Sequence, residues 1–132
     1  MNIFLDDERD PKYVKTMMSG FYPQDWIIAR NYFEFCKLVD EHLEEIKLVS
    51  FDHDIASYDE SGKEWTGKDA ADYLINKCLD SGRIFPSWFV HTSNTSGRPN
   101  IIGAILNYLK YIENQKIDWR YYHSGIINGR AI

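Results

Sequence analysis

Leu48-Val49-Ser50-Phe51, followed at once by Asp52-His53-Asp54, is the stretch of sequence that decides the fold. Its first four residues predict a short buried strand, and three titratable side chains stand directly after it. Two other apolar runs end in the same way: residues 2–5 lead into Asp6-Asp7, and residues 88–90 lead into His91-Thr92-Ser93-Asn94. The chain therefore places acidic, imidazole and hydroxyl groups where three predicted strands end.

The segments between these strands predict helices. Asn31, with Glu34 three residues later, is a near match to a capping box, and apolar residues follow at helical spacing. Thr66 caps a second predicted helix with Asp69 at its third position, and Gly82 is expected to end that helix. Both helices are long enough to connect neighbouring parallel strands.

The rest of the chain adds weaker signals. Residues 26–29 and 119–122 predict two further short strands, and residues 12–19 predict a short helix. Pro99 fits the first position of a third long helix. Residues 55–65 form a polar stretch that is long for a loop in a compact domain, which marks it as a candidate functional loop.

Strands that alternate with helices predict an α/β fold with a parallel sheet. We expect one domain over residues 1–132, with a three-layer, flavodoxin-like or receiver-like architecture and a five-stranded sheet in the order 2-1-3-4-5. Strands 1, 3 and 4 are neighbours in that order. Because ligands bind at the carboxyl ends of such strands, the three polar clusters are expected to form one site.

Composition limits the class of function. A net charge of −5 and a pI near 5.3 argue against a generic binder of nucleic-acid backbones, although a small nucleotide is compatible with them. Cys36 and Cys78 are too few for a metal cluster or a disulfide framework, so we expect reduced thiols. We also expect a cytoplasmic protein, because no signal peptide precedes the first strand and no apolar run is long enough for a membrane span.

The acidic residues at the strand ends are candidate metal ligands. Asp6, Asp7 and Asp52 offer the oxygen ligands that Mg²⁺ or Mn²⁺ accepts. A plain turn or helix cap explains the Asp6-Asp7 pair equally well when it is taken alone. Strand alternation sends Asp52 and Asp54 to one side and His53 to the other, so both carboxylates can approach a metal, or one can orient an imidazole.

The other polar residues suit work on a phosphate. His91, His53 and Asp54 are candidates for moving a proton, since imidazole titrates near neutral pH. Candidate phosphate-binding residues are Arg9, Ser93, Asn94 and Arg98, the last at the start of a predicted helix whose N-terminus attracts anions. The alternative for His91 is a structural role as a hydrogen-bonded histidine in the core. The alternative for Arg9 is an ion pair at the surface.

Four blocks of sequence resemble the cyclic-phosphate processing receiver-like family. Residues 3–11 resemble an L-D-D-x-R-x-P opening, and residues 50–55 resemble S-L-D-H-D-L. Residues 66–69 are similar to T-G-x-D, and residues 91–100 to H-S-x-N-x-x-G-R-x-N. The resemblance runs from residue 2 to about residue 110. Ala56 stands where the family often has glycine, and Thr92 where it usually has serine.

This resemblance implies a receiver fold with an acidic pocket and the processing of nucleotides that contain a cyclic phosphate. The pocket would comprise Asp6, Asp7, Arg9, Asp52, His53, Asp54, His91, Asn94 and Arg98. An ordinary phosphorelay receiver is a poorer match, because Tyr122-His123 stand where receivers have a lysine. We therefore expect a metal-assisted phosphoesterase. The alternative is a module that binds a cyclic nucleotide without cleaving it, as a sensor or sponge.

Overall fold

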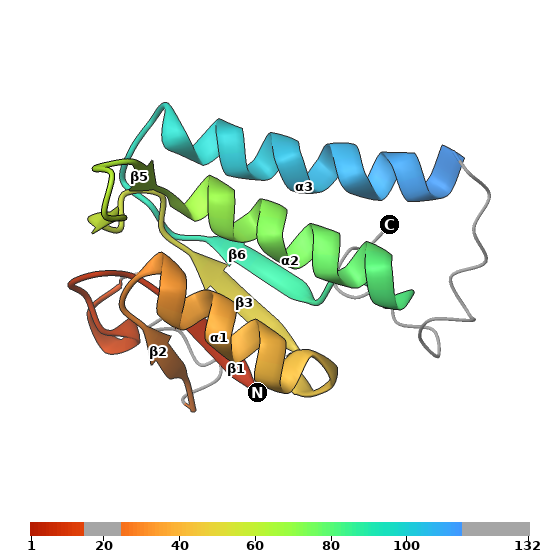
Figure 1. Cartoon of the computed structure of the whole chain (residues 1–132), viewed down its shortest axis with the longest axis horizontal. Helices are drawn as coiled ribbons and strands as arrows, with labels where there is room; N and C mark the ends of the chain where they lie inside the picture. The colour runs from red at the N-terminus through yellow and green to blue at the C-terminus, as the bar shows by residue number, and fades with distance from the viewer. Residues whose placement is uncertain (15–24, 115–132) are drawn as a thin grey trace.

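The computed structural model describes residues 1–14 and 25–114, and it shows an α/β fold built on a parallel sheet (Figure 1). Four strands form this sheet in the order β2-β1-β3-β6. Their bounds are Asn2–Leu5 for β1, Ile27–Ala29 for β2, Leu48–Phe51 for β3 and Ser87–Val90 for β6. The helices are α1, α2 and α3, with bounds Tyr32–His42, Gly67–Ser81 and Gly97–Asn114, and the short 3₁₀ turns are Pro11–Tyr13 and Leu43–Glu45.

The predicted strand order holds for the first four strands. β1 lies between β2 and β3, and β3 lies between β1 and β6, with all three pairings parallel. The expected fifth strand at residues 119–122 lies outside the described residues. So does most of the expected helix at residues 12–19, of which the structure describes only a 3₁₀ turn at Pro11–Tyr13.

The three long helices pack against the sheet and against each other. α1 and α2 cover one face of the sheet, and α3 runs beside α2 and contacts β6 (Figure 1). The crossover connections β2-α1-β3 and β3-α2-β6 both lead towards the β6 edge of the sheet. Right-handed crossovers then put both helices on the same face. The second helical layer of the predicted three-layer fold is not among the described residues.

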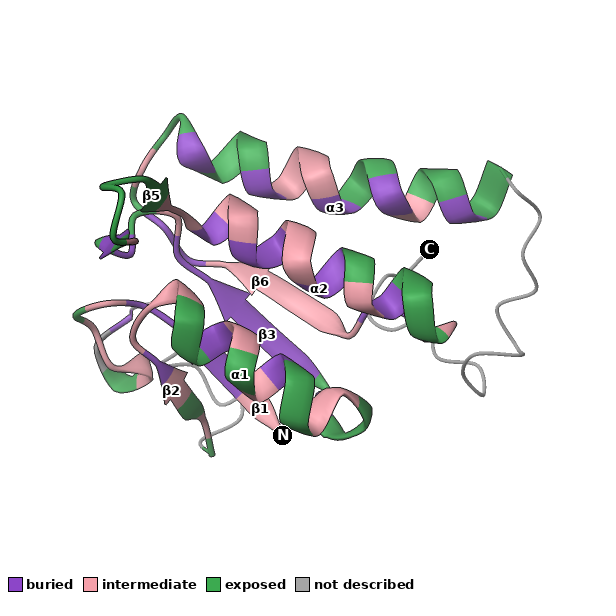
Figure 2. Ribbon diagram, in the orientation of Figure 1, coloured by how far each residue is buried: buried purple, intermediate pink, exposed green. Residues whose placement is uncertain are grey.

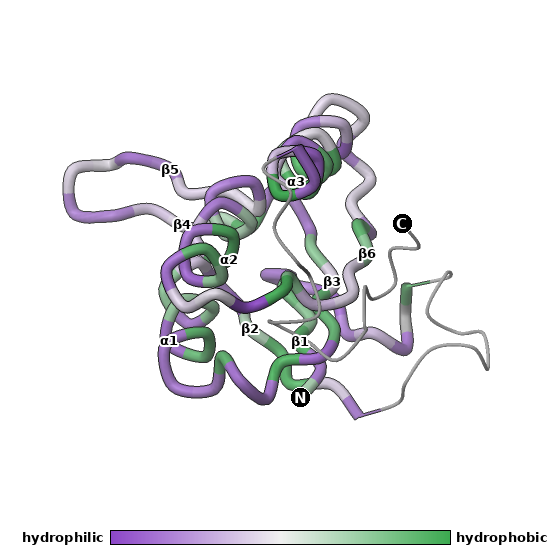
Figure 3. Tube along the Cα trace, turned by 90° about the vertical axis from the view of Figure 1, so that its right-hand side faces the viewer, coloured by the Kyte–Doolittle hydropathy of each residue, from purple (hydrophilic) through white to green (hydrophobic). Residues whose placement is uncertain are grey.

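Apolar side chains fill the space between the sheet and the helices. β1 and β3 are almost entirely buried (Figure 2), and the apolar segments of the strands and helices face one another (Figure 3). The core includes Ile3, Leu5, Val49 and Phe51 from the strands and the buried faces of all three helices. Across the part of the chain that the structure describes, no helix is long and apolar enough to cross a membrane.

The predicted helix starts and stops are largely confirmed. Asn31 Oδ1 accepts a hydrogen bond from Glu34 N at 2.9 Å, and Thr66 forms a full capping box with Asp69. Gly82 ends α2 with a φ of 69°, in the left-handed region that glycine enters without strain. The prediction for Pro99 was wrong by two residues, because α3 begins at Gly97. Pro99 still lies in the first turn, where no N–H is needed.

The stretch at residues 55–65 is a small hairpin rather than an irregular loop. β4 (Ser57–Tyr58) pairs antiparallel with β5 (Glu64–Trp65), and Asp59 holds the turn by accepting bonds from residues 61, 63 and 65. These hydrogen bonds lower the pKa of Asp59 to about 2, the Ser61 hydroxyl contributing most. Ala56, which replaces the frequent glycine, has a φ of 45° and therefore keeps a backbone conformation that favours glycine.

The capping box predicts a measurable stability effect. Thr66→Ala removes the hydroxyl that caps the first turn of α2, and we expect it to lower the free energy of unfolding by about 1 kcal/mol. Urea unfolding followed by circular dichroism measures this loss. Thr66→Ser is the control, because it keeps the hydroxyl and is expected to remain close to the wild type. An equal loss in both variants would show that the cap is not the cause.

Candidate functional site

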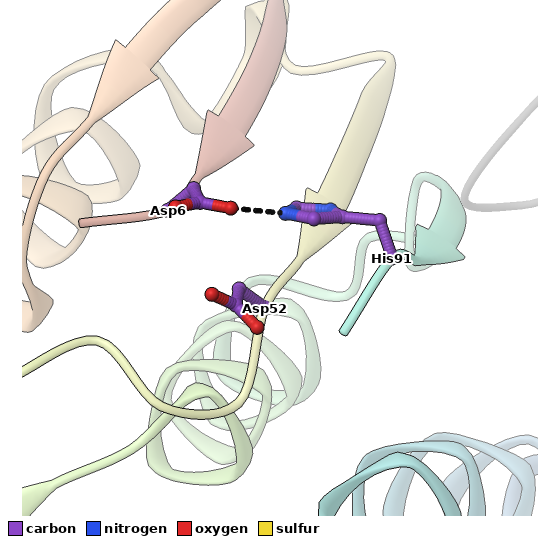
Figure 4. Close-up of side chains that lie close together, drawn as sticks. All are labelled: Asp6, Asp52 and His91. Carbon is purple, nitrogen blue, oxygen red and sulfur yellow. Dashed lines mark hydrogen bonds and ion pairs between the residues drawn. The ribbon is translucent and has the colours of Figure 1, made fainter. Parts of the chain in front are cut away.

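The carboxyl ends of β1, β3 and β6 bring three predicted site residues together. Asp6 follows β1, Asp52 follows β3 and His91 follows β6 (Figure 4). Each offers one ligand atom, and these atoms lie within 4.8 Å of one another. All three residues are buried. The sheet topology therefore converts three separate sequence positions into one cluster, as the strand order predicts.

Asp6 is the most heavily bonded member of the cluster. Its Oδ1 atom accepts the backbone N–H groups of Glu8 at 2.9 Å and Arg9 at 2.8 Å. Its Oδ2 atom accepts Arg9 Nε at 2.9 Å and His91 Nε2 at 3.0 Å. Burial alone would raise the pKa of Asp6, but these hydrogen bonds and the Arg9 charge outweigh it and hold that pKa well below its usual range. Asp6 is therefore a buried carboxylate that stays ionised.

Arg9 reaches from Asp6 towards Asp52. Its Nε atom bonds Asp6, and its Nη2 atom lies 3.5 Å from Asp52 Oδ2. The Arg9 side chain as a whole is about one-third exposed, and Arg9 lines the cleft described below. Arg30, just after β2, donates from Nη1 to the carbonyls of Asp6 and Arg9 and from Nη2 to Asp10. The loop that carries Asp6 and Arg9 is thus held by a second arginine.

His91 is enclosed on every side. Its Nδ1 atom lies 2.7 Å from Ser50 Oγ, its Nε2 atom lies 3.0 Å from Asp6, and its ring stacks on Phe4 with centroids 4.3 Å apart. The side chain has 0% exposure. This Ser-His-Asp chain does not have the geometry of a nucleophilic triad, because Ser50 is fully buried within β3 and out of reach of a substrate.

The segment after β3 behaves as strand alternation predicts. Asp52 and Asp54 both line the cleft described below, whereas the His53 ring packs against Gly97 at the start of α3. His53 Nδ1 lies 2.9 Å from Asp54 Oδ1, and Asn94 Nδ2 donates to Asp54 Oδ2 at 2.8 Å. Hydrogen bonds from His53 and then Asn94 lower the pKa of Asp54. Asp54 is therefore held as a carboxylate by two predicted site residues.

The predicted phosphate-binding residues of the 91–100 block have other partners in the structure. Asn94 Oδ1 accepts the backbone N–H groups of Ser96 and Gly97, so this side chain caps the start of α3. Arg98 Nη2 donates to the carbonyl of Thr92 at 3.0 Å. Ser93 is exposed and lines the cleft. Of these three residues, only Ser93 lines the cleft, and its side chain makes no hydrogen bond among the described residues.

A cleft of about 430 Å³ opens beside the cluster, and its lining is strongly acidic. Five carboxylates and one guanidinium face it, together with two hydroxyl side chains. The lining residues are Asp6, Asp7, Glu8, Arg9, Asp52, Asp54, Thr92 and Ser93. Burial, followed by the charges of Asp6, Glu8 and Asp52, raises the pKa of Asp7. The cleft therefore holds excess negative charge that a bound cation would relieve.

The donor set fits a divalent cation. Carboxylate oxygens predominate, as Mg²⁺ requires, and the imidazole of His91 is also acceptable to Mn²⁺. The spacing of up to 4.8 Å is close to the roughly 4 Å that separates opposite ligands of such an ion. Asp7 is the most accessible of the three predicted ligands, since Asp6 and Asp52 are both buried. Asp6 would have to exchange one of its present hydrogen bonds to bind the ion directly.

Two glycines let helices approach the end of β3 closely. A Cβ atom at Gly67 would collide with the carbonyl of Asp52, and Gly67 N donates to the carbonyl of His53 at 2.8 Å. A Cβ atom at Gly97 would lie closer than 3.0 Å to the His53 ring. The first turns of α2 and α3 thus depend on glycine to pack around the Asp52-His53 corner.

Four residues near the site are not among those that the sequence pattern predicts, namely Ser50, Arg30, Glu8 and Thr92. Ser50 stands in an otherwise apolar strand, and this interruption was a usable signal of a buried partner. Arg30 directly follows β2, so the strand-end criterion that selected Asp6 and His91 would have selected it too. Glu8 and Thr92 lie next to predicted site residues. The sequence pattern does not show which side chains of a run of polar residues face the cleft.

Comparison with known proteins identifies the family. Residues 1–107 match the family described as the cyclic-phosphate processing receiver domain, and the chain belongs to that family. Neither the curated proteins nor the solved structures include a significant match. The family assignment agrees with the resemblance of the four sequence blocks and with the receiver-like order of the four described strands.

The close packing of Gly97 on His53 predicts a specific response to substitution. Gly97→Ala forces the His53 ring away from Asp54, and we expect a loss of about 1–3 kcal/mol in the free energy of unfolding. The NMR resonances of the His53 ring should shift as well. Gly103→Ala, in the same helix and with no atom within 4 Å of the new Cβ, is the matched control and should be neutral or stabilising. Equal behaviour of the two variants would contradict this packing.

Proposed function

We propose that this domain is a metal-assisted phosphoesterase that opens cyclic phosphates or cyclic nucleotides. The observation that supports this most strongly is the convergence of Asp6, Asp52 and His91 beside an acidic cleft that also holds Arg9. The cleft volume of about 430 Å³ lies in the roughly 300–1,000 Å³ range of small-molecule sites. Family membership favours a substrate with a cyclic phosphate.

The proposed reaction is a hydrolysis. The oxygen of a water molecule forms a bond to phosphorus, and one ring P–O bond breaks. The oxygen that leaves takes up a proton, and the phosphate stays attached to the product through its remaining ester bond. A cyclic phosphodiester and one water thus give one phosphomonoester, or one linear phosphodiester when the ring contains several nucleotides.

The charge of the cleft is the reason for proposing a metal. Five carboxylates against one guanidinium would repel an anionic substrate unless a cation were bound. Asp6, Asp7 and Asp52 are the proposed ligands of Mg²⁺ or Mn²⁺. Such an ion polarises phosphoryl oxygens and lowers the pKa of a bound water.

Residues of the chain supply the remaining contacts with the phosphate. Arg9 is the proposed phosphate clamp, because Asp6 holds its Nε atom while the partly exposed side chain lines the cleft. Ser93 adds an exposed hydroxyl to the lining of the cleft. Asn94 and Arg98 remain predicted phosphate ligands, and each would have to exchange its present partner to serve as one.

The two candidate histidines differ in their freedom to move a proton. Both ring nitrogens of His91 are engaged by protein groups, and its side chain has 0% exposure. The His53 side chain is 15% exposed and is bonded to Asp54, which lines the cleft. We therefore assign proton transfer to the His53-Asp54 pair and the positioning of Asp6 to His91.

One observation favours the alternative, a module that binds a cyclic nucleotide without cleaving it. Asp6 and His91 already have partners at every strong acceptor or donor position, so neither has a free atom for chemistry. In this alternative the same cleft captures the phosphate, and no bond breaks. Recovery of intact ligand after denaturation of a complex would distinguish binding from turnover.

A hydrolysis screen tests the proposal. The substrates are 2′,3′-cyclic nucleotides, ADP-ribose cyclic phosphate, and cyclic mono- and oligonucleotides, each with Mg²⁺, with Mn²⁺ and with a chelator. We expect a ring-opened product only with metal. Asp52→Asn and Asp6→Asn should each lower turnover at least about 100-fold, because each removes charge from the proposed cation site. Chromatography of the products gives the readout.

Asp72→Asn is the matched control for the two variants. Asp72 is an acidic residue of α2 that pairs with Lys68 away from the cleft, and its loss should leave turnover within about twofold of the wild type. His53→Ala should lower turnover and alter its pH profile. Failure of every substrate, or full activity in Asp52→Asn, would rule out the proposed phosphoesterase.

A further inference from the structure

Ser50 is a buried polar residue that the proposed reaction does not use. It lies in β3 with 0% exposure, between Val49 and Phe51, and its register neighbours on the adjoining strands are Phe4 and Phe89. Burying a hydroxyl without a hydrogen bond destabilises a fold, because the hydroxyl loses its hydrogen bonds to water. A serine at this position therefore needs a partner, and a small apolar residue would otherwise suit the strand better.

The partner of Ser50 is the imidazole of His91. Ser50 Oγ lies 2.7 Å from His91 Nδ1, which is a short and buried hydrogen bond. On the other side of the ring, His91 Nε2 lies 3.0 Å from Asp6 Oδ2, and Phe4 stacks on the ring face with an interplanar angle of 9°. Both nitrogens of the ring and one of its faces are thus in contact with other protein groups.

The hydrogen-bond chemistry sets the tautomer of His91. Both oxygens of Asp6 accept from N–H donors, namely Glu8 N and Arg9 N at Oδ1 and Arg9 Nε at Oδ2, so Asp6 is also the acceptor towards His91 and the proton between the two groups belongs to His91 Nε2. In the neutral ring, Nδ1 is then an acceptor, and the Ser50 hydroxyl must be the donor. Ser50 therefore donates to His91, and His91 donates to Asp6.

The hydrogen-bond network continues from Asp6 to the cleft. The oxygen that accepts His91 Nε2 also accepts Arg9 Nε at 2.9 Å, and Arg9 Nη2 lies 3.5 Å from Asp52. Rotation of the Asp6 carboxylate would break the Arg9 contact and the two backbone hydrogen bonds of the 6–9 loop. The position of Arg9 at the cleft thus depends on a carboxylate whose rotation His91 limits.

We propose that Ser50 is a positioning residue, whose hydroxyl orients His91 and thereby fixes Asp6 and Arg9 at the cleft. Ser50 itself touches no substrate. The effect on turnover rests on the proposed phosphoesterase function, whereas the effect on His91 and Arg9 does not.

The test compares Ser50→Ala with Ser50→Thr, which keeps the hydroxyl, and with the control Ser57→Ala. Ser57 is also a buried serine, but its Oγ accepts from Tyr32 N, away from the cleft. Nitrogen NMR of the histidine rings and hydrogen exchange of the arginine Nε–H groups report the positions of His91 and Arg9 without any substrate. The kcat and KM for a substrate found in the hydrolysis screen supply the second readout.

In the wild type we expect His91 to be protonated on Nε2, with an Nδ1 resonance typical of a hydrogen-bonded acceptor. In Ser50→Ala that resonance should move towards the value of a free ring nitrogen, and Arg9 Nε–H should exchange faster. The kcat should fall about 10- to 100-fold with little change in KM. Ser50→Thr should restore the wild-type resonance and most of kcat, and Ser57→Ala should change neither.

Two results would overturn the proposal. One is a wild-type His91 protonated on Nδ1 alone, which is measurable even if Ser50→Ala does not fold. The other is a folded Ser50→Ala with unchanged His91 and Arg9 signals. If the wild type turns over no substrate while the NMR results are as expected, the proposed phosphoesterase fails and the positioning of Arg9 by Ser50 stands.

Discussion

The burial of one charged carboxylate, Asp6, is the constraint on which the rest of the site depends. A buried carboxylate is costly unless it is hydrogen-bonded and paired, and Asp6 meets this requirement with two backbone N–H groups, Arg9 and His91. The His91 contact joins the end of β1 to the end of β6, and the other three hold the loop of residues 6–9 that follows β1. Because β3 lies between these strands, Asp52 is held beside the same group. The sheet order and the buried charge thus define the site together.

This arrangement explains why an acidic cleft also contains the arginine that we propose as the phosphate clamp. Arg9 is drawn to the cleft by Asp6 and Asp52, and the excess of carboxylates favours a divalent cation beside it. The first turns of α2 and α3 approach the Asp52-His53 corner through Gly67 and Gly97. Membership of the cyclic-phosphate processing family supports the proposal of a substrate with a cyclic phosphate, and the cleft provides the groups proposed to act on it.

Much of this organisation could be predicted from the sequence, because it depends on local pattern. Short apolar runs predict the four described strands and their order in the sheet, and helix caps predict the starts of two helices. The polar residues at the strand ends predict Asp6, Asp52 and His91 as site residues. What the sequence pattern could not show depended on tertiary contacts. Asn94 and Arg98 look like phosphate ligands in the sequence, but they bond Asp54 and Thr92. The burial of His91 follows from Ser50 and Phe4, which lie 41 and 87 residues away along the chain.

The measurement that tests this account most directly is the pKa of Asp6, obtained by carbon NMR of its side-chain carboxyl group during an acid titration. Asp6→Asn would identify the resonance. The account predicts that Asp6 is still ionised at about pH 3, below the ordinary aspartate value of about 3.9, because its hydrogen bonds outweigh burial. A midpoint at or above the ordinary value would contradict it, since Asp6 would then not be the charged centre that holds His91 and Arg9 in place.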